Sequence, residues 1–389
     1  MHSFDAIVVG AGIVGAALAL ALRDADLTVA VIEPAPPRVP DHAGGWDSRV
    51  YTVSPGNVSW LEGLGVWGTL SSERLTRVEA MEVFGDRGGS RLDFSAYEAG
   101  MRELAWVAES RELQSALWQA LEAAPHVTLY CGARCTDIAW ERDAARLHLD
   151  DGGELAGRLV VGADGSDSWV RERAGIAVKT HQYRQLGVVA NFEAERPHRG
   201  VAYQWFTGDS VLALLPLPDR LVSMVWSAPE ARARELLAMP AEALTAEVER
   251  ASADAIGRLK VITPSAAFPL KRQHVARLVE PRVALIGDAA HNIHPLAGQG
   301  VNLGLRDARE FGRVLAGRGP RRDCGDHTLL RRYERARRED IAALELTTDG
   351  LEKLFNGPAV WLAGLRNLGL TLVDAQSPLK TALARRAAA

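Results

Sequence analysis

The chain has 389 residues with a formal net charge of -4 and a pI near 6.2. Such a balance supplies no broad basic field, so we exclude nucleic-acid binding as its function. Hydrophobic residues make up 47% and charged residues 24% of the chain, as in ordinary globular proteins. The length favours two domains, or one large domain with an inserted lobe.

Cysteine use and hydropathy bear on the compartment. The three cysteines suit a reducing compartment better than a disulfide framework. Asp5 stands where a signal peptide would be basic, and no uninterrupted apolar run reaches about 18 residues. We therefore expect a cytoplasmic protein. Leucines and aromatic residues after position 350 accompany Lys353 and Arg366; peripheral contact with the inner face of the cytoplasmic membrane and packing on the domain or on a second subunit both stay open.

Residues 4–33 read as strand, turn, helix and strand, which is one βαβ unit. Gly10, Gly12 and Gly15 would allow a tight turn, close approach of the backbone to a diphosphate, and packing of the helix on the strand. Glu33 ends the second strand, at the offset of a carboxylate that binds ribose hydroxyls. The unit predicts an adenine dinucleotide site.

A second stretch with the same bare glycine spacing serves as a comparison. Gly63, Gly65 and Gly68 follow a helix-like run over 58–61 rather than a strand, and no strand with a terminal acid comes after them. We interpret this stretch as the end of a helix.

The middle of the chain predicts an inserted β-rich domain. The later part of 100–121 has helical spacing, in a series that includes Leu104 and Val107. The strands expected over 127–129, 135–140 and 145–149 resemble a short meander, and a strand over 159–161 returns to the buried sheet. Longer β-like runs follow over 187–192, 201–206, 211–217 and 221–226, before helical material over 229–257. We predict a discontinuous nucleotide-binding domain (1–75, 100–175 and 275–340), a substrate domain (76–99 and 176–274) and a helical C-terminal region (341–389).

Two further segments carry acids next to glycines. Asp164 and Gly165 follow an apolar run that ends a buried strand, an arrangement that suits either a nucleotide site or an ordinary helix cap. The run Val283–Ile286 breaks at Gly287, so that Asp288 can present a carboxylate before a glycine-rich bend. Such a break suits a polyol and a flat polar ring.

Taken in order, the three glycine sites resemble the single-component flavoprotein aromatic hydroxylases, whose fold is that of p-hydroxybenzoate hydroxylase. The segments 195–206, 287–307 and 366–370 are similar to the ubiquinone-biosynthesis hydroxylases that act on polyprenylated phenols. The resemblance implies an α/β fold, with a Rossmann-like FAD-binding domain, an inserted β-rich substrate domain and a helical C-terminus.

The resemblance also implies a set of cofactor residues. Glu33 would hold the ribose, Arg49 and Arg111 would contact the cofactor, and Asp288 would bind the ribityl chain. The expected cofactor-binding set is Gly10, Gly12, Gly15, Glu33, Arg49, Arg111, Asp164, Gly165, Gly287, Asp288, Gly300, Val301 and Asn302, and the expected flavin lining is Pro295, Gly298, Gln299 and Gly300. We assign no acid or base, and no metal, because His291 and His294 lack a carboxylate at ligand spacing.

In the reaction that the resemblance implies, FAD is reduced by NAD(P)H or by a separate reductase, and dioxygen forms a C4a-hydroperoxide that hydroxylates the phenol. Other quinone-biosynthesis enzymes would be partners. Two alternatives stay open: a hydroxylase of another aromatic substrate, and a flavin-holding assembly subunit.

Three of the expected strands carry a group of large apolar side chains. These side chains, which would roof the flavin or else be core residues of a sheet, are Tyr203, Trp205, Phe206, Leu212, Leu214 and Trp226.

Overall fold

The computed structural model describes residues 2–38, 40, 45–85, 91–293 and 299–356. The predictions for His294, Pro295, Gly298 and residues 357–389 lie outside these ranges. Of the side chains after residue 344, only that of Leu346 is described.

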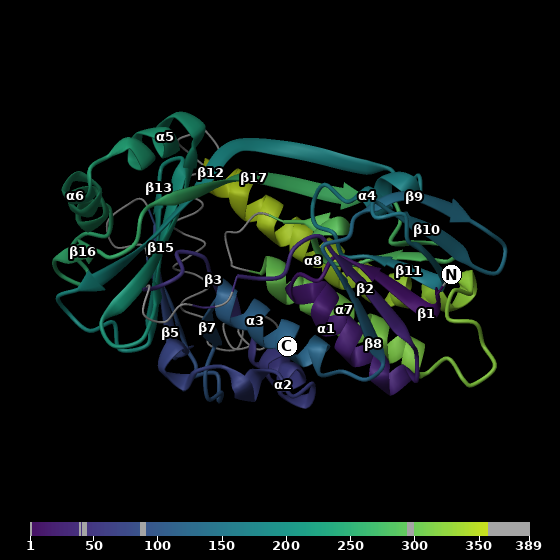
Figure 1. The fold of residues 1–389 in the computed structure, drawn as a ribbon. Helices are drawn as coiled ribbons and strands as arrows, with labels where there is room; N and C mark the ends of the chain where they lie inside the picture. Colours follow the sequence, from purple (N-terminus) through teal and green to yellow (C-terminus); the bar gives the residue numbers. More distant parts are fainter. Residues whose placement is uncertain (1, 39, 41–44, 86–90, 294–298, 357–389) are drawn as a thin grey trace.

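A parallel sheet forms the centre of one half of the molecule, at the right of Figure 1. Its strand order is β19-β11-β1-β2-β8. Antiparallel strands β18, β9 and β10 extend it. Its strands are β1 (His2–Val9), β2 (Val29–Glu33), β8 (Val127–Cys131), β9 (Cys135–Trp140), β10 (Ala145–Leu149), β11 (Glu154–Gly162), β18 (Val279–Glu280) and β19 (Val283–Leu285). The second half of β1 and most of β2 are buried on both faces, as expected for strands of a covered parallel sheet.

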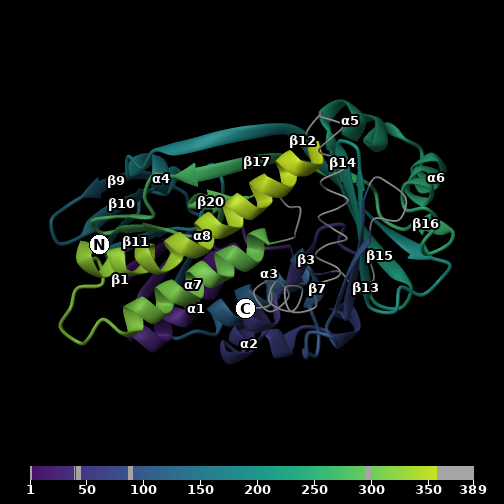
Figure 2. The same ribbon diagram turned by 180° about the vertical axis from the view of Figure 1, so that it is seen from behind.

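Helices cover this sheet (Figure 2). Helix α1 packs against α3 and α7, and α7 packs against α8. Their bounds are α1 (Ile13–Ala21), α3 (Ser110–Glu122), α7 (Gly300–Ala316) and α8 (His327–Asn356). Because five of the nine residues of α1 are alanine or glycine and the helix is buried over nearly its whole length, the neighbouring helices can approach it closely.

A second sheet forms the other half of the molecule, in the order β20-β17-β12-β15-β14-β13-β5-β6, with β16 beside β12. Its strands are β5 (Ala80–Phe84), β6 (Arg91–Ser95), β12 (Val178–Ala194), β13 (Val201–Thr207), β14 (Ser210–Pro216), β15 (Leu221–Pro229), β16 (Leu259–Val261), β17 (Ala266–Val275) and β20 (His291–Asn292). Helices α5 (Glu230–Ala238) and α6 (Ala241–Ala251) lie on its outer side (Figure 1).

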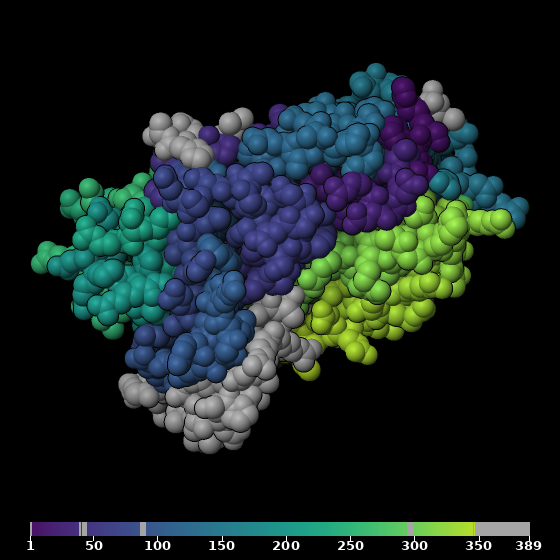
Figure 3. Space-filling view, turned by 90° about the horizontal axis from the view of Figure 1, so that it is seen from below, coloured from purple at the N-terminus to yellow at the C-terminus, as the bar shows by residue number. Residues whose placement is uncertain are grey.

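A small sheet of β3 (Val50–Val53), β7 (Ala105–Glu109) and β4 (Thr76–Val78) lies between the two larger sheets. Val78 and Val107 pack there against Ala202 and Leu217 of the second sheet. Seen from below (Figure 3), the segments between residues 50 and 110 lie between the teal and green atoms at the left and the yellow-green atoms at the right.

The remaining elements are short. They are α2 (Pro55–Gly63), α4 (Trp169–Arg173) and four 3-10 turns, η1 (Leu22–Ala25), η2 (Trp67–Thr69), η3 (Ser72–Arg74) and η4 (Gly287–Ala289). No helix in the described part of the chain is long and apolar enough to span a bilayer.

Most predicted elements are confirmed, and two need correction. The helix expected in 100–121 begins only at Ser110, because Val107 belongs to β7, which pairs with β3 and β4. The strands expected to form a meander do not all pair, since β8 joins β2 in parallel while β9 and β10 form a hairpin. The second glycine stretch is a helix end, as predicted: α2 ends at Gly63, and Gly65 has a φ of 78°.

The first glycine loop leaves almost no room for side chains at two of its positions. Gly10 has a φ of 99°, and a Cβ atom there would lie 2.5 Å from the carbonyl oxygen of Ala163. A Cβ at Gly15 would lie 2.0 Å from the carbonyl oxygen of Gly10, whereas a Cβ at Gly12 would meet nothing within 4 Å. The loop therefore needs Gly10 and Gly15 in order to fold, but it does not need Gly12 for that purpose.

This difference predicts the stability of two apoprotein variants. Gly15→Ala should lower the free energy of unfolding by about 1–3 kcal/mol, since the backbone must shift to accept the methyl group. Gly12→Ala, at a φ of -61°, should change it by less than about 0.5 kcal/mol. Denaturant unfolding of the two cofactor-free variants measures both values; equal losses would contradict the loop geometry.

Candidate active site

Three loops that are far apart in sequence meet at one edge of the parallel sheet, because β1, β11 and β19 all end there. A Cβ at Gly10 would lie 2.9 Å from the Cα of Asp164. A Cβ at Gly287 would lie 3.3 Å from Val14 of α1. The first glycine motif, residues 10–15, thus contacts both the Asp164 loop and the Gly287 turn.

Arg171 of α4 holds two of these loops together. Its side chain is buried, and Nη1 donates to the carbonyl oxygen of Ala289 at 3.0 Å while Nη2 donates to that of Ser166 at 2.9 Å. Arg171 was not among the predicted site residues, because its two acceptors are backbone atoms that no side-chain pattern reveals.

The N-terminus of α1 is arranged as an anion site. Gly12 is the cap residue; no side chain caps the helix, and its first turn carries no acid. The Ala11 N–H donates to Oε2 of Glu33 at 2.7 Å, which keeps that carboxylate at the end of β2 beside the loop. Free N–H groups and the helix dipole at such an end favour a phosphate group.

One carboxylate oxygen of Asp164 binds the backbone at the start of α4, and the other has no partner in the described part of the chain. Its Oδ2 accepts from the Val170 N–H at 3.0 Å, as a residue that caps α4 would. Its Oδ1 is buried and has no hydrogen-bond partner among the described residues. A buried acceptor normally has a donor, so a ligand hydroxyl at this atom would satisfy it.

Asp47 brings Arg49 and Arg111 together. Its carboxylate accepts from the Arg49 N–H at 3.0 Å and from the Arg111 N–H at 3.2 Å, and Nε of Arg111 lies 3.4 Å away. The Asp47 N–H donates to Glu109, and its carbonyl oxygen accepts from Nδ2 of Asn191 at 2.8 Å. Asp47 was not among the predicted site residues, since most of its partners come from two distant segments, around positions 109–111 and at 191.

Asp288 is accessible to solvent but has protein on several sides. Its side chain is exposed, yet the surrounding protein desolvates the carboxyl enough to raise its pKa, against the lowering charges of His291, Arg49 and Lys271. The Arg49 guanidinium also lies 5.3 Å from the ring centroid of Tyr51. The fold thus brings positions 49 and 288 into one electrostatic environment.

The start of α7 supplies backbone rather than side-chain groups. No side chain caps this helix, and its first turn has no acid. The Asn302 side chain is used elsewhere, because Oδ1 accepts from the Ser54 N–H at 2.8 Å and Nδ2 donates to the Thr52 carbonyl at 2.8 Å. Gln299 has a buried Oε1 without a partner in the described part of the chain.

These features fit a flavin dinucleotide. The open space at Gly12 and the α1 N-terminus suit a diphosphate, Glu33 suits a ribose, and the orphaned oxygens of Asp164 and Gln299 suit donors on a ligand. Glu33 and Asp164 thus lie near the first glycine loop. Arg49 shares the electrostatic environment of Asp288, and Asp47 links Arg49 to Arg111.

Of the two interpretations of the large apolar group, the structure favours core residues of the sheet for most members. Four of its members pack on the side of the second sheet that α5 and α6 cover, together with Ala233 of α5 and Leu244 of α6; they are Trp205, Leu212, Leu214 and Trp226. Tyr203 lies on this same side, and only Phe206 points to the other. Strand alternation was visible in the sequence, but it does not tell which side of a sheet faces the cofactor.

The side that faces the parallel sheet carries the residues in between. Asn191 reaches Asp47 from it, and the register puts Ser223, Ala213 and Val225 on that side too. Ala213 and Val225 are only partly buried. Small and aliphatic side chains, rather than indole rings, therefore line this face.

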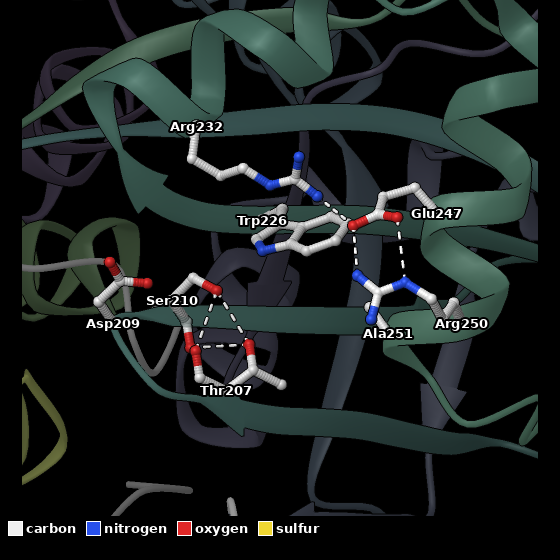
Figure 4. Close-up of a pocket in the computed structure, with 8 residues that line it drawn as sticks. All are labelled: Thr207, Asp209, Ser210, Trp226, Arg232, Glu247, Arg250 and Ala251. Atoms are coloured by element: carbon white, nitrogen blue, oxygen red, sulfur yellow. Dashed lines mark hydrogen bonds and ion pairs between the residues drawn. The ribbon is translucent and has the colours of Figure 1, made fainter.

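Behind the sheet, a cavity of about 360 Å³ lies under α5 and α6 (Figure 4). Glu247 pairs there with both Arg232 and Arg250, and the Arg232 guanidinium lies 5.9 Å from the Trp226 ring centroid. These arginines already have a carboxylate partner. The cavity is separated from the cofactor edge by the whole thickness of the sheet.

Comparisons with known proteins agree with this geometry. A protein family described as an FAD binding domain matches residues 3–347. Ubiquinone hydroxylase UbiL of Rhodospirillum rubrum is 36% identical over 98% of this chain and 89% of its own length. The 3-demethoxyubiquinol 3-hydroxylase of Escherichia coli is 38% identical over 96% of this chain and 95% of its own.

Two solved structures share the fold. PqsL of Pseudomonas aeruginosa has a TM-score of 0.80 at 25% identity, over 95% of this chain and 100% of that one. HpxO of Klebsiella pneumoniae, complexed with FAD and uric acid, has a TM-score of 0.73 at 21% identity, over 97% of this chain and 96% of that one. The chain belongs to the FAD binding domain family, among the flavoprotein monooxygenases that include the ubiquinone-biosynthesis hydroxylases.

Proposed function

We propose that this protein is an FAD-dependent monooxygenase that hydroxylates the aromatic ring of a polyprenylated phenol in ubiquinone biosynthesis. The observation that carries the proposal is the near full-length identity of 36% and 38% with two ubiquinone-pathway hydroxylases. The convergence of the three glycine loops supports it, because each loop carries groups that suit a different part of a flavin dinucleotide.

The cofactor supplies the oxygen chemistry when it is bound, and the chain's own groups hold and polarise it. Glu33 would bind the ribose, the N-terminus of α1 the diphosphate, and Asp288 the ribityl hydroxyls. Arg49 and Arg111, fixed by Asp47, would contact the cofactor. The N–H groups at Gly300 and Val301 would stabilise negative charge on the flavin ring with the help of the α7 dipole.

The substrate would lie between the second sheet and the cofactor edge. The partly buried Ala213 and Val225 on the inward side give an apolar wall that suits a phenol with an isoprenoid chain. NAD(P)H or a separate reductase would provide the electrons, and dioxygen the inserted atom. Contacts with other quinone-biosynthesis enzymes and with the inner face of the cytoplasmic membrane belong to the same proposal.

Sheet membership supports the proposed domain boundaries except at β20. Strands β5 and β6, from the segment 76–99, pair within the sheet built by residues 178–275. The short strand β20 (His291–Asn292) joins the same sheet from the segment 275–340. Strand β19, from the segment 275–340, pairs with β11 of the parallel sheet. The helical material expected from residue 341 includes the end of α8, which is described as far as Asn356.

Substitution of Gly12 or Asp288 should weaken the binding of FAD. Gly12→Ala should raise the Kd for FAD about ten-fold or more, because the methyl group enters the space offered to the diphosphate. A ten-fold rise corresponds to a loss of about 1.4 kcal/mol of binding free energy. Asp288→Ala should raise it about 10- to 100-fold, as expected for the loss of a charged hydrogen-bond acceptor. Quenching of flavin fluorescence measures both values; purified variants with wild-type flavin content would contradict these roles.

A wider side chain on the inward face should affect the substrate and not the cofactor. Ala213→Phe should raise the KM for a polyprenylated phenol about ten-fold, while the Kd for FAD stays within about two-fold of wild type. Steady-state kinetics and flavin titration of the same preparation provide the two values. A raised Kd for FAD with an unchanged KM would place Ala213 at the cofactor instead.

Isotope labelling tests the reaction itself. With labelled dioxygen, FAD and a reductant, one labelled oxygen atom should enter the ring of a polyprenylated phenol, as mass spectrometry of the product would show. Turnover of only an untailed phenol would favour a hydroxylase of another aromatic compound. FAD binding without incorporation into any phenol would favour an assembly subunit.

A further inference from the structure

The Asp307 carboxylate on α7 is fully buried and joins three parts of the chain. Its Oδ2 accepts from the Gly287 N–H at 3.0 Å and lies 2.6 Å from Nε2 of His291. Its Oδ1 accepts from Nε of Arg337, on α8, at 2.8 Å. One carboxylate therefore binds the first residue of the turn that presents Asp288 and also binds a helix outside the cofactor edge.

The same turn is held from its other end. The buried Arg171 guanidinium donates to the carbonyl oxygen of Ala289 at 3.0 Å. Gly287 has a φ of 58°, and a Cβ atom at Gly304 of α7 would lie 3.2 Å from the Gly287 Cα. With its N–H bound on one side, its carbonyl on the other and a helix backbone against it, the turn has little freedom to reorient Asp288.

The charges of this cluster depend on one another. Desolvation by itself would raise the pKa of Asp307 and lower that of His291, but their mutual attraction and hydrogen bond reverse both shifts. Arg337 adds a second cation beside Asp307 and also donates to Asp340 at 2.8 Å. The carboxylate thus stays ionised and retains its full strength as an acceptor for the Gly287 N–H.

Stability alone does not account for such a cluster. Buried ion pairs contribute little net stability compared with apolar residues of the same volume, although breaking one is costly. Contacts between α7 and α8 already include Phe311 against Tyr333, with ring centroids 4.7 Å apart. The ionic cluster adds a fixed acceptor for the Gly287 N–H, and this hydrogen bond fixes the orientation of the backbone at Gly287.

We propose that Asp307, His291 and Arg337 are positioning residues that orient the Gly287–Ala289 turn, so that the affinity for FAD depends in part on a side chain of α8. The inference rests on the proposed binding of FAD by this protein and adds its dependence on residues that do not touch the cofactor.

The experiment compares four variants with the wild type. Asp307→Asn and Arg337→Met each remove one charge of the cluster, Arg337→Lys keeps the charge but not the guanidinium geometry, and Tyr333→Phe is the matched control. Tyr333 is also buried on α8 and donates to the carbonyl oxygen of Leu285 at 3.0 Å, a bond that does not involve the turn. For each full-length protein, we would measure the unfolding free energy without cofactor, the Kd for FAD, and the visible circular dichroism of bound FAD at saturation.

The expected result is a Kd raised about ten-fold or more and an altered flavin dichroism for Asp307→Asn and Arg337→Met. Arg337→Lys should fall between them and the wild type, and it provides a folded test case if either charge-removing variant does not fold. Tyr333→Phe should lose stability but keep the Kd within about two-fold and keep the wild-type dichroism.

Unchanged Kd and dichroism in the folded cluster variants would overturn the positioning role, and so would a control that changes both as much as they do. A wild-type protein that binds no FAD would overturn the proposed function, and this inference with it. The two failures are therefore distinguishable.

Discussion

The candidate site depends on the parallel pairing of β1, β11 and β19. Parallel strands end at the same edge of a sheet, so the loops that follow them must meet, however far apart they lie in the sequence. Side chains at Gly10 or Gly15 would collide with the neighbouring backbone, and their absence lets the loops approach within contact distance. The residues of the candidate site come together because of this strand order, and no single motif would bring them together.

Local patterns were enough to predict the βαβ unit and the turn at Gly287. In each case the signal is a glycine after an apolar run, and both parts lie within a few residues of one another. The same locality separated the first glycine stretch from the second, where a helix precedes Gly63. The helix predicted in the later part of 100–121 is confirmed from Ser110 onward. Val107 has helical spacing to the later leucines, but long-range pairing with β3 and β4 makes it part of a strand.

The parts that the sequence did not reveal are those that depend on distant partners. The role of Asp47 requires groups at positions 109, 111 and 191, and that of Asp307 requires positions 287 and 337. The direction of Trp226 requires knowledge of which side of the second sheet is covered by α5 and α6. The alternation of residues along a strand separates the two faces of a sheet. Which face lies toward the candidate site is determined only when the sheet and the helices pack together.

The Asp307 cluster has a consequence for how sequences of this kind can diverge. A buried carboxylate with two cationic partners does not tolerate the loss of one member alone, because the remaining charges stay buried without compensation. Asp307, His291 and Arg337 should therefore be replaced together or not at all among descendants of a common ancestor. Substitution in the Gly287–Ala289 turn would then be coupled to substitution in α8. A design that moves the glycine motifs to another protein would also have to include the part of α8 that carries Arg337.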